Sequence, residues 1–303
     1  MNPLAQSISD EDLVEILYAT ILKRTPDVSG FKNYTNRILN LPRKEALNIL
    51  INNFINSEEY KKNLLGNISL KSIVNNRVQD KNTIINHIIS LGTTCYTSQL
   101  LKKADLKKYS GPFDWIFSSP AMVAHVIDDD FNIFLDKSHH KNIPTKFSRI
   151  SGTRELPVAH QFYLDNYSVS DVFNHHDVNI NEDYNYFTRA IERFRKVLLL
   201  SEPVMFVICT KHSEDTHKQF KMVSSAILKR KSSLSCLRYI SIEEGDSTLP
   251  TCEILDNSIY DFELIHFKSS SKWKDLNFEN LIDDIAILNI ISRGVNFKLM
   301  QID

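Results

Sequence analysis

The residue types best suited to chemistry first come together in a short turn. The segment Ser90-Leu91-Gly92-Thr93-Thr94-Cys95 ends an apolar, β-prone run, Ile84–Leu91, and precedes a helical pattern over Tyr96–Lys103. Cys95 is therefore expected at a helix N-terminus, where unpaired N–H groups and the helix dipole lower the pKa of a thiol. This position predicts a nucleophilic thiolate; the alternative is a small cysteine packed behind the turn. The turn that would bind substrate consists of Gly92, Thr93 and Thr94.

A second candidate segment is Ser110-Gly111-Pro112-Phe113-Asp114-Trp115-Ile116. Gly-Pro favours a turn. An aspartate between two aromatic residues is either a hydrogen-bonded structural carboxylate or a group that orients a catalytic base. We assign Asp114 to the second role as a working hypothesis, with Trp115 beside it in the substrate-binding region.

The densest set of titratable residues is Asn174-His175-His176-Asp177. Such a segment suits a metal site, a general base or a polar loop, but adjacent side chains diverge, which weakens a chelate. We therefore expect no metal ion or other cofactor, and assign His176 as the base, with Asp114 or Asp177 orienting it and His175 near the substrate. His266, at the end of the apolar run Phe262–Ile265, is the rival base, although it lacks a DxxH spacing.

These side chains need a scaffold, and the chain beyond residue 83 supplies one. β-prone runs occur at Ile84–Leu91, Val204–Cys209, Leu237–Ile242 and Phe262–Phe267, and helical patterns lie among them at Tyr96–Lys103, Tyr184–Leu200 and His217–Lys229. Strands that alternate with helices favour a mostly parallel sheet covered on both faces. Residues 83–303 are thus predicted to form a Rossmann-like α/β domain. Because such sheets bind ligands at the carboxyl ends of their strands, we expect Cys95, His176 and Asp114 to converge there.

The first part of the chain has a different pattern. Apolar residues recur at helical spacing from residue 9 to about 65, and Pro26 and Pro42 stand where new helices could begin. We predict a small all-α domain over residues 1–66 and a polar linker over 67–82, with strands only beyond residue 83.

Composition narrows the class of protein. Lys plus Arg number 36 against 37 for Asp plus Glu, so there is no charge excess to favour nucleic acid. No apolar stretch approaches the roughly 20 residues that span a bilayer, and residues 1–12 do not resemble a signal peptide. The four cysteines form no CxxC pair, which argues against a zinc ribbon or a disulfide framework. We expect a cytoplasmic protein with no membrane span.

The helical part resembles the DUF4214 family, which has an LY…L.R.PD..G...W core and a closing F..S.E[FY]. Tyr34 stands where that family usually has Trp. The resemblance implies a packing role for these residues rather than a catalytic one. The matching positions are Leu17-Tyr18, Leu22, Arg24, Pro26-Asp27, Gly30, Phe54, Ser57, Glu59 and Tyr60.

The α/β part resembles the DUF1796 family, named for a papain-like cysteine peptidase, over about residues 84–210. The resemblance places the family's nucleophile on Cys95, its DW pair on Asp114-Trp115, its HD pair on His176-Asp177 and its helix arginine on Arg193. Two features depart from the family pattern: Thr188-Arg189-Ala190 replaces a double arginine, and the tail with Trp273 and Asp275 matches loosely. The resemblance to the DUF1796 family depends on the segments SLGTTC, YSGPFDWIFSSP and FNIFLD, the HD pair and the helix before VMFVICT.

The leading hypothesis is a cysteine-dependent acyl-transfer enzyme, a peptidase-like hydrolase acting on a peptide, acyl or glycan substrate. A thiolate attacks a carbonyl, backbone N–H groups near residues 93–96 hold the oxyanion, and His176 shuttles the proton. Two alternatives remain open: an acyltransferase, or a noncatalytic module of surface-polysaccharide metabolism that binds carbohydrate or nucleotide-activated donors. In the latter, the helical domain recruits a protein partner.

Overall fold

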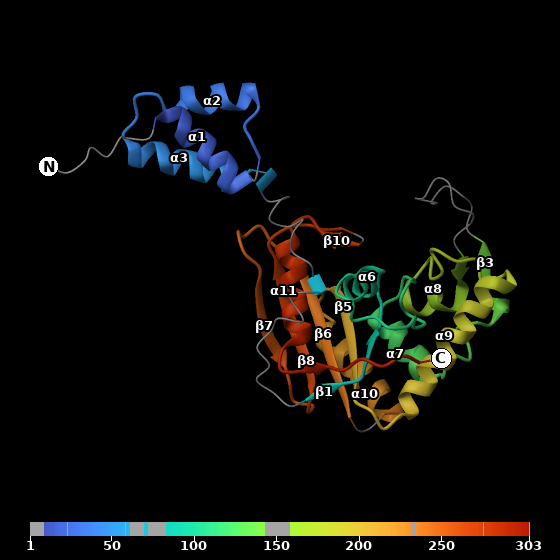
Figure 1. The fold of residues 1–303 in the computed structure, drawn as a ribbon. Helices are drawn as coiled ribbons and strands as arrows, with labels where there is room; N and C mark the ends of the chain where they lie inside the picture. Colours follow the sequence, from blue (N-terminus) through green and yellow to red (C-terminus); the bar gives the residue numbers. More distant parts are fainter. Residues whose placement is uncertain are drawn as a thin grey trace. The chain divides into compact units, whose positions relative to one another are not determined.

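The structure is a computed structural model, and it describes residues 9–22, 24–57, 59–60, 70–71, 83–142, 158–231, 234–274 and 276–302. The chain divides into two compact units, Met1–Ser69 and Leu70–Asp303, each considered by itself (Figure 1). Most of the predicted linker, and Asp275, lie outside the described residues. None of the described helices combines the length and apolar character needed to cross a membrane.

The described residues of the first unit form helices joined by short loops, as predicted. Helix α1 (Asp10–Leu17) continues into a π-helical turn, η1 (Tyr18–Leu22), and is followed by α2 (Val28–Ile38) and α3 (Arg43–Ile55). A capping box between Ser9 and Asp12 starts α1. The hydrophobic core of the first unit comprises Leu13, Val14, Leu17, Tyr18, Leu22, Ile38, Ala46, Leu50 and Phe54.

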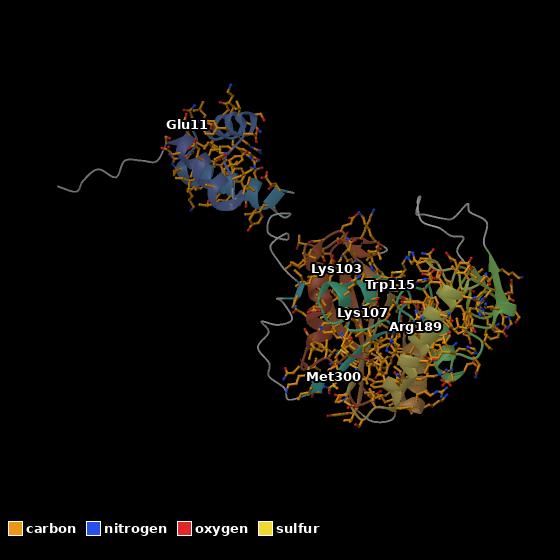
Figure 2. The ribbon with its side chains drawn as sticks, turned by 45° about the vertical axis from the view of Figure 1, so that its right-hand side comes forward. Glu11, Lys103, Lys107, Trp115, Arg189 and Met300 are labelled. Atoms are coloured by element: carbon orange, nitrogen blue, oxygen red, sulfur yellow. The ribbon has the colours of Figure 1, made fainter. Side chains whose placement is uncertain are left out.

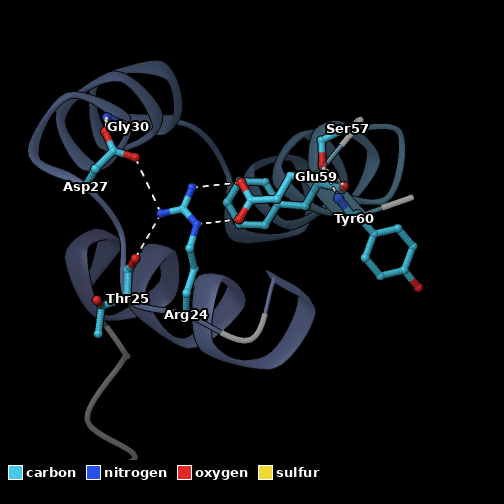
Figure 3. Close-up of polar contacts among 8 residues, drawn as sticks. Arg24, Thr25, Asp27, Gly30, Ser57, Glu59 and Tyr60 are labelled. Carbon is cyan, nitrogen blue, oxygen red and sulfur yellow. Dashed lines mark hydrogen bonds and ion pairs between the residues drawn. The ribbon is translucent and has the colours of Figure 1, made fainter. Parts of the chain in front are cut away.

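Arg24 ties this unit together (Figure 3). Its guanidinium bonds both carboxylate oxygens of Glu59 and donates to the Thr25 carbonyl at 2.9 Å. Asp27 caps α2 by accepting from the Gly30 N–H at 2.8 Å. The residues of this segment that match the DUF4214 pattern therefore close a loop and cap a helix, which is a packing role.

A five-stranded sheet forms the centre of the second unit, with the order β2-β5-β6-β8-β7. The first four strands are parallel, and β7 pairs antiparallel with β8 at the edge. This confirms a Rossmann-like, mostly parallel α/β fold after a small all-α unit. The strands span His87–Ser90 (β2), Val204–Lys211 (β5), Ser235–Glu244 (β6), Thr251–Asp256 (β7) and Phe262–Ser269 (β8).

Helices cover both faces of this sheet (Figure 1). Apolar residues of α7, α8, α9 and α10 join one buried cluster with one face of the strands, and those of α6 and α11 join the other. The strand interior is apolar on both sides, as expected when both faces are buried. The helices span Tyr96–Lys103 (α6), Pro120–Asp128 (α7), Gln161–Tyr167 (α8), Asn181–Leu199 (α9), Thr216–Arg230 (α10) and Leu281–Ser292 (α11).

The apolar run Ile84–Leu91, predicted as one strand, is broken at Asn86. The N–H groups of Asn86 and His87 both donate to the Pro203 carbonyl, and the Asn86 side chain donates to the Lys298 carbonyl. The chain before the break, β1 (Ile84–Ile85), pairs instead with β11 (Asn296–Phe297). The remaining short elements are η2 (Lys137–His139), β3 (His140–Asn142) with β4 (Val158–His160), and β9 (Trp273–Lys274) with β10 (Asn277–Phe278).

Candidate active site

Cys95 lies directly before α6, just beyond the carboxyl end of the edge strand β2. Its backbone is already helical, and only 3% of its surface is exposed. Gly92 has a φ of +73° and lies so close to Phe113 that an added Cβ would come within 2.7 Å of the Phe113 carbonyl oxygen. Glycine is thus needed here both for its conformation and for its lack of a side chain.

Thr93 fixes the turn in an unusual conformation. Its φ is +93°, a region that β-branched residues rarely adopt. Its hydroxyl donates to the Cys209 carbonyl at 2.7 Å, and its backbone exchanges two bonds with Ser118, at 3.1 and 3.2 Å. The Tyr96 N–H donates to the Thr94 hydroxyl at 3.3 Å. The Thr93 N–H is therefore engaged by the later loop and the Tyr96 N–H within the turn.

Asp114 is buried in an ion pair. Its carboxylate accepts from the Lys107 ammonium and from the Gly111 N–H, the latter at 2.6 Å, with 2% of its surface exposed. Burial raises the pKa of Asp114 and lowers that of Lys107. The Lys107 ammonium lies 5.7 Å from the centre of the half-buried Trp115 ring (both labelled in Figure 2). These contacts give Asp114 a structural environment.

His176 is oriented by a carboxylate that the sequence did not indicate. Its Nδ1 lies 3.0 Å from an oxygen of Asp183, in the first turn of α9, and the other oxygen of Asp183 accepts from the Asp177 N–H at 2.7 Å. The ring stacks on Tyr186 with centroids 4.9 Å apart. In this structure the partner of the imidazole is thus Asp183, whereas the sequence suggested Asp114 or Asp177 for this role.

The physical reason is local. The Asp177 carboxylate turns back to accept the Asn179 N–H at 3.0 Å, a common turn-forming bond for aspartate. Asp114 is occupied by Lys107 and Gly111. His175 is exposed on the same loop, with its Nε2 at 3.3 Å from the Asn174 side-chain nitrogen.

A short stretch of chain links the cysteine turn to the histidine segment. The Ser118 N–H donates to the Thr93 carbonyl at 3.1 Å, and the preceding N–H, of Phe117, donates to the Val172 carbonyl at 3.0 Å. Val172 lies four residues before His176. The two segments are therefore fastened to consecutive residues of the loop that follows Trp115.

The rival base, His266, also has a carboxylate partner. Its Nε2 lies 3.0 Å from Glu243 on the neighbouring strand β6. Its ring lies 4.4 Å from that of His212, whose Nδ1 is 2.6 Å from the Ser241 hydroxyl. Sequence reasoning missed His212 and Glu243, although each stands at or directly after the end of a buried strand.

The other cysteines differ from Cys95 in position. Cys209 and Cys236 are buried within β5 and β6, and burial raises the pKa of each thiol to about 12. Cys252 is exposed on the edge strand β7. Within the described part of the chain, no group of three or more His, Cys, Asp or Glu side chains is arranged to hold a metal ion.

A buried carboxylate also contacts the residue after Cys95. The Tyr96 hydroxyl donates to Asp284 at 2.8 Å, and burial raises the pKa of Asp284 to about 6. Its neighbour Asp283 accepts three bonds from Ser270 and Ser271, at the end of β8. The N-terminus of α11 is thereby fastened to α6 and β8.

Comparison with known proteins agrees with this organisation. The model of a domain of unknown function, DUF4214, matches residues 2–64. Searches of curated proteins and of solved structures returned no match. The model described as "Putative papain-like cysteine peptidase (DUF1796)" matches residues 86–242, which include Cys95, Asp114 and His176. Because that match spans more than half of the chain, the protein belongs to the DUF1796 family.

Proposed function

We propose that the α/β unit is a thiol-dependent acyl-transfer hydrolase in which Cys95 is the nucleophile, His176 the base and Asp183 the group that orients it. The observation that carries the proposal is the position of Cys95, at the N-terminus of α6 and at the carboxyl end of β2. Helix N-termini stabilise a thiolate, and open α/β sheets bind ligands at this edge. The family's peptidase-like description supports the same reaction class.

The roles of the residues follow from their contacts. Because Nδ1 of His176 faces Asp183, Nε2 is the nitrogen that accepts the thiol proton. The Cys95 sulfur attacks a substrate carbonyl carbon and forms a C–S bond, and the oxygen takes the negative charge. His176 then protonates the leaving group, and a water that loses its proton to His176 hydrolyses the thioester. We assign the oxyanion to the N–H of Thr94, the residue before the nucleophile; the N–H groups of Thr93 and Tyr96 already bond the hydroxyls of Ser118 and Thr94.

The sheet order favours His176 over His266. Strand β8, which carries His266, is separated from β2 by β5 and β6. At about 4.8 Å per strand, three steps amount to roughly 14 Å, too far for direct proton transfer from Cys95. The His176 segment is fastened instead to the loop that binds the Thr93 turn.

The test is the alkylation rate of each cysteine with iodoacetamide, followed by peptide mass spectrometry across pH 5.5 to 9. The chain supplies its own references: the exposed Cys252, and the buried Cys209 and Cys236. A thiolate nucleophile predicts that Cys95 reacts faster than Cys252 below pH 7, whereas Cys209 and Cys236 react only on unfolding. A Cys95 rate no higher than that of Cys252 throughout this range would refute the proposal.

Three variants separate the bases. His176→Ala and Asp183→Asn are expected to slow Cys95 alkylation near neutral pH by roughly tenfold, because the proton acceptor is lost or misoriented. His266→Ala is the matched control, since it removes a second carboxylate-bonded imidazole, and its rate should equal that of the wild type. Slowing by His266→Ala alone would assign the base to His266.

A further inference from the structure

A groove opens in the helical layer, and neither Cys95 nor His176 is among its lining residues. It has a volume of about 700 Å³ and lies between α7 and α10, with the end of α8 beside it. We refer to it as the α7–α10 groove. Small-molecule sites commonly measure about 300–1,000 Å³, so its size suits a ligand of one or two rings.

One wall of the groove carries basic side chains. His217, Lys218 and Lys221 all line it from the first half of α10. Lys218 and Lys221 are three residues apart, and His217 and Lys221 four, which places them on one helix face. All three side chains are exposed, so the fold does not need their charges for its own core.

The nearby carboxylates form no ion pair with the lysines of this wall within the described chain. Asp128 is the acidic residue among the described lining residues, and both its oxygens accept from Lys229, at 3.0 and 3.1 Å. Asp256, near Lys221 and His217, accepts the Ser258 N–H and forms no ion pair with either within the described chain. The Ser258 N–H chiefly lowers the pKa of Asp256, and the charges of Lys221 and His217 lower it further through space, but neither lysine ammonium is held in an ion pair by Asp256.

The opposite wall offers flat and apolar surface. The ring of Tyr167, at the end of α8, lies 5.4 Å from that of His125 on α7. Met222, 37% exposed, adds a flexible apolar side chain from α10, the helix that also carries the lysines. Aromatic rings and methionine suit the face of a planar ring.

We propose that the α7–α10 groove binds a phosphate monoester joined to a planar ring. Lys218, Lys221 and His217 hold the phosphate, and Tyr167, His125 and Met222 contact the ring. Two flexible ammonium groups on one helix face suit a dianion with three terminal oxygens, because each can reach a different oxygen. The proposal is independent of the chemistry at Cys95.

The test is isothermal titration calorimetry of the full chain at low ionic strength with AMP, which joins a phosphate to a planar ring. Adenosine and inorganic phosphate are the two comparison probes. AMP should bind more tightly than either, and added salt should weaken it. If adenosine bound as tightly as AMP, the phosphate would not contribute to binding. If inorganic phosphate bound as tightly as AMP, the ring would not contribute.

Variants locate the binding. Lys218→Ala and Lys221→Ala should each lower the affinity for AMP by roughly tenfold, which corresponds to the loss of one charge-assisted hydrogen bond. Arg189→Ala is the matched control, because Arg189 is exposed on α9 (labelled in Figure 2) and does not line the groove, so this variant should bind AMP like the wild type. No heat of AMP binding at millimolar concentration, or equal weakening by Arg189→Ala, would overturn the assignment.

Discussion

The Thr93 hydroxyl donates to the Cys209 carbonyl at 2.7 Å, and this bond joins the turn after β2 to the strand beside it. Thr93 does so with a φ of +93°, which costs on the order of 1–3 kcal/mol for a residue other than glycine. The bond and the two backbone contacts with Ser118 hold that conformation in place.

This relationship predicts the effect of Thr93→Val. The side-chain shape is kept but the hydroxyl is lost, so the free energy of unfolding should fall by about 1–3 kcal/mol in urea titrations. Thr93→Ser retains the hydroxyl and should stay within about 1 kcal/mol of the wild type. Equal stability of the valine and serine variants would show that the bond does not hold the turn.

The buried pair of Asp114 and Lys107 predicts a large loss of stability in Asp114→Asn. An uncompensated ammonium remains in an apolar site, so the free energy of unfolding should fall by about 3–5 kcal/mol. The double variant Asp114→Asn with Lys107→Met should recover part of this, because the unpaired charge is removed. If Asp114 is structural, as its contacts indicate, Cys95 alkylation in the folded variant stays at the wild-type rate. Slowed alkylation without a loss of stability would contradict this role.

The buried His160 makes the free energy of unfolding depend on pH. It is fully buried, and burial lowers its pKa from 6.5 to about 4, with His140 and His139 acting in the same direction. The unfolded chain therefore binds the proton more readily than the folded chain. The contribution of neutral His160 to the free energy of unfolding is lost as the pH falls below about 6.5. The free energy of unfolding should drop by about 2 kcal/mol between pH 7.5 and 5 from this group.

His160→Gln isolates this effect, since it keeps a side-chain donor for the Ile133 carbonyl that lies 3.0 Å from His160 Nε2. The difference in unfolding free energy between wild type and variant should change by about 2 kcal/mol over the same pH range. A pH-independent difference would mean that His160 titrates normally in the folded state.

Asp284 has the opposite pH dependence. Its pKa is raised from 3.8 to about 6, chiefly by burial, so the folded state prefers the protonated acid. Stability is therefore lost as the pH rises from about 4 to 6 and stays lower above that. Asp284→Asn removes the charge and keeps an acceptor for Tyr96, and should raise the free energy of unfolding at pH 8 by about 1–3 kcal/mol.

The benefit of Asp284→Asn should vanish near pH 4, where the wild-type acid is already protonated. Unfolding curves at pH 4 and 8 measure both values. A variant that is less stable than the wild type at pH 8 would show that the carboxylate charge stabilises the first turn of α11.

The sequence predicted the local features well. Helix α6 covers Tyr96–Lys103, as the spacing indicates, because its apolar residues lie on one face. The runs Val204–Cys209, Leu237–Ile242 and Phe262–Phe267 became β5, β6 and β8, since strands buried on both faces read as continuous apolar segments.

The features that could not be predicted from the sequence either have weak hydrophobic periodicity or depend on contacts between distant side chains. Helix α11 has buried residues on several sides, including the consecutive Ile290, Ile291 and Ser292, so no apolar stripe reveals it. Strand β7 is mostly exposed and carries little apolar signal. Asp183 lies seven residues from His176, and nothing in the spacing distinguishes it from Asp114 or Asp177. Choosing among carboxylates needs the fold.

The strands β2, β5, β6 and β8 stand in the sheet in the order in which the chain makes them. Cys95, Asp114, His176 and Asp183 therefore all belong to one connection, residues 91–203, between two neighbouring parallel strands. The residues proposed to react are thus all carried by one long connection, and the remaining strands form a regular scaffold. Its loops can change in length and residue type while the hydrogen-bond ladder from β5 to β8 stays the same.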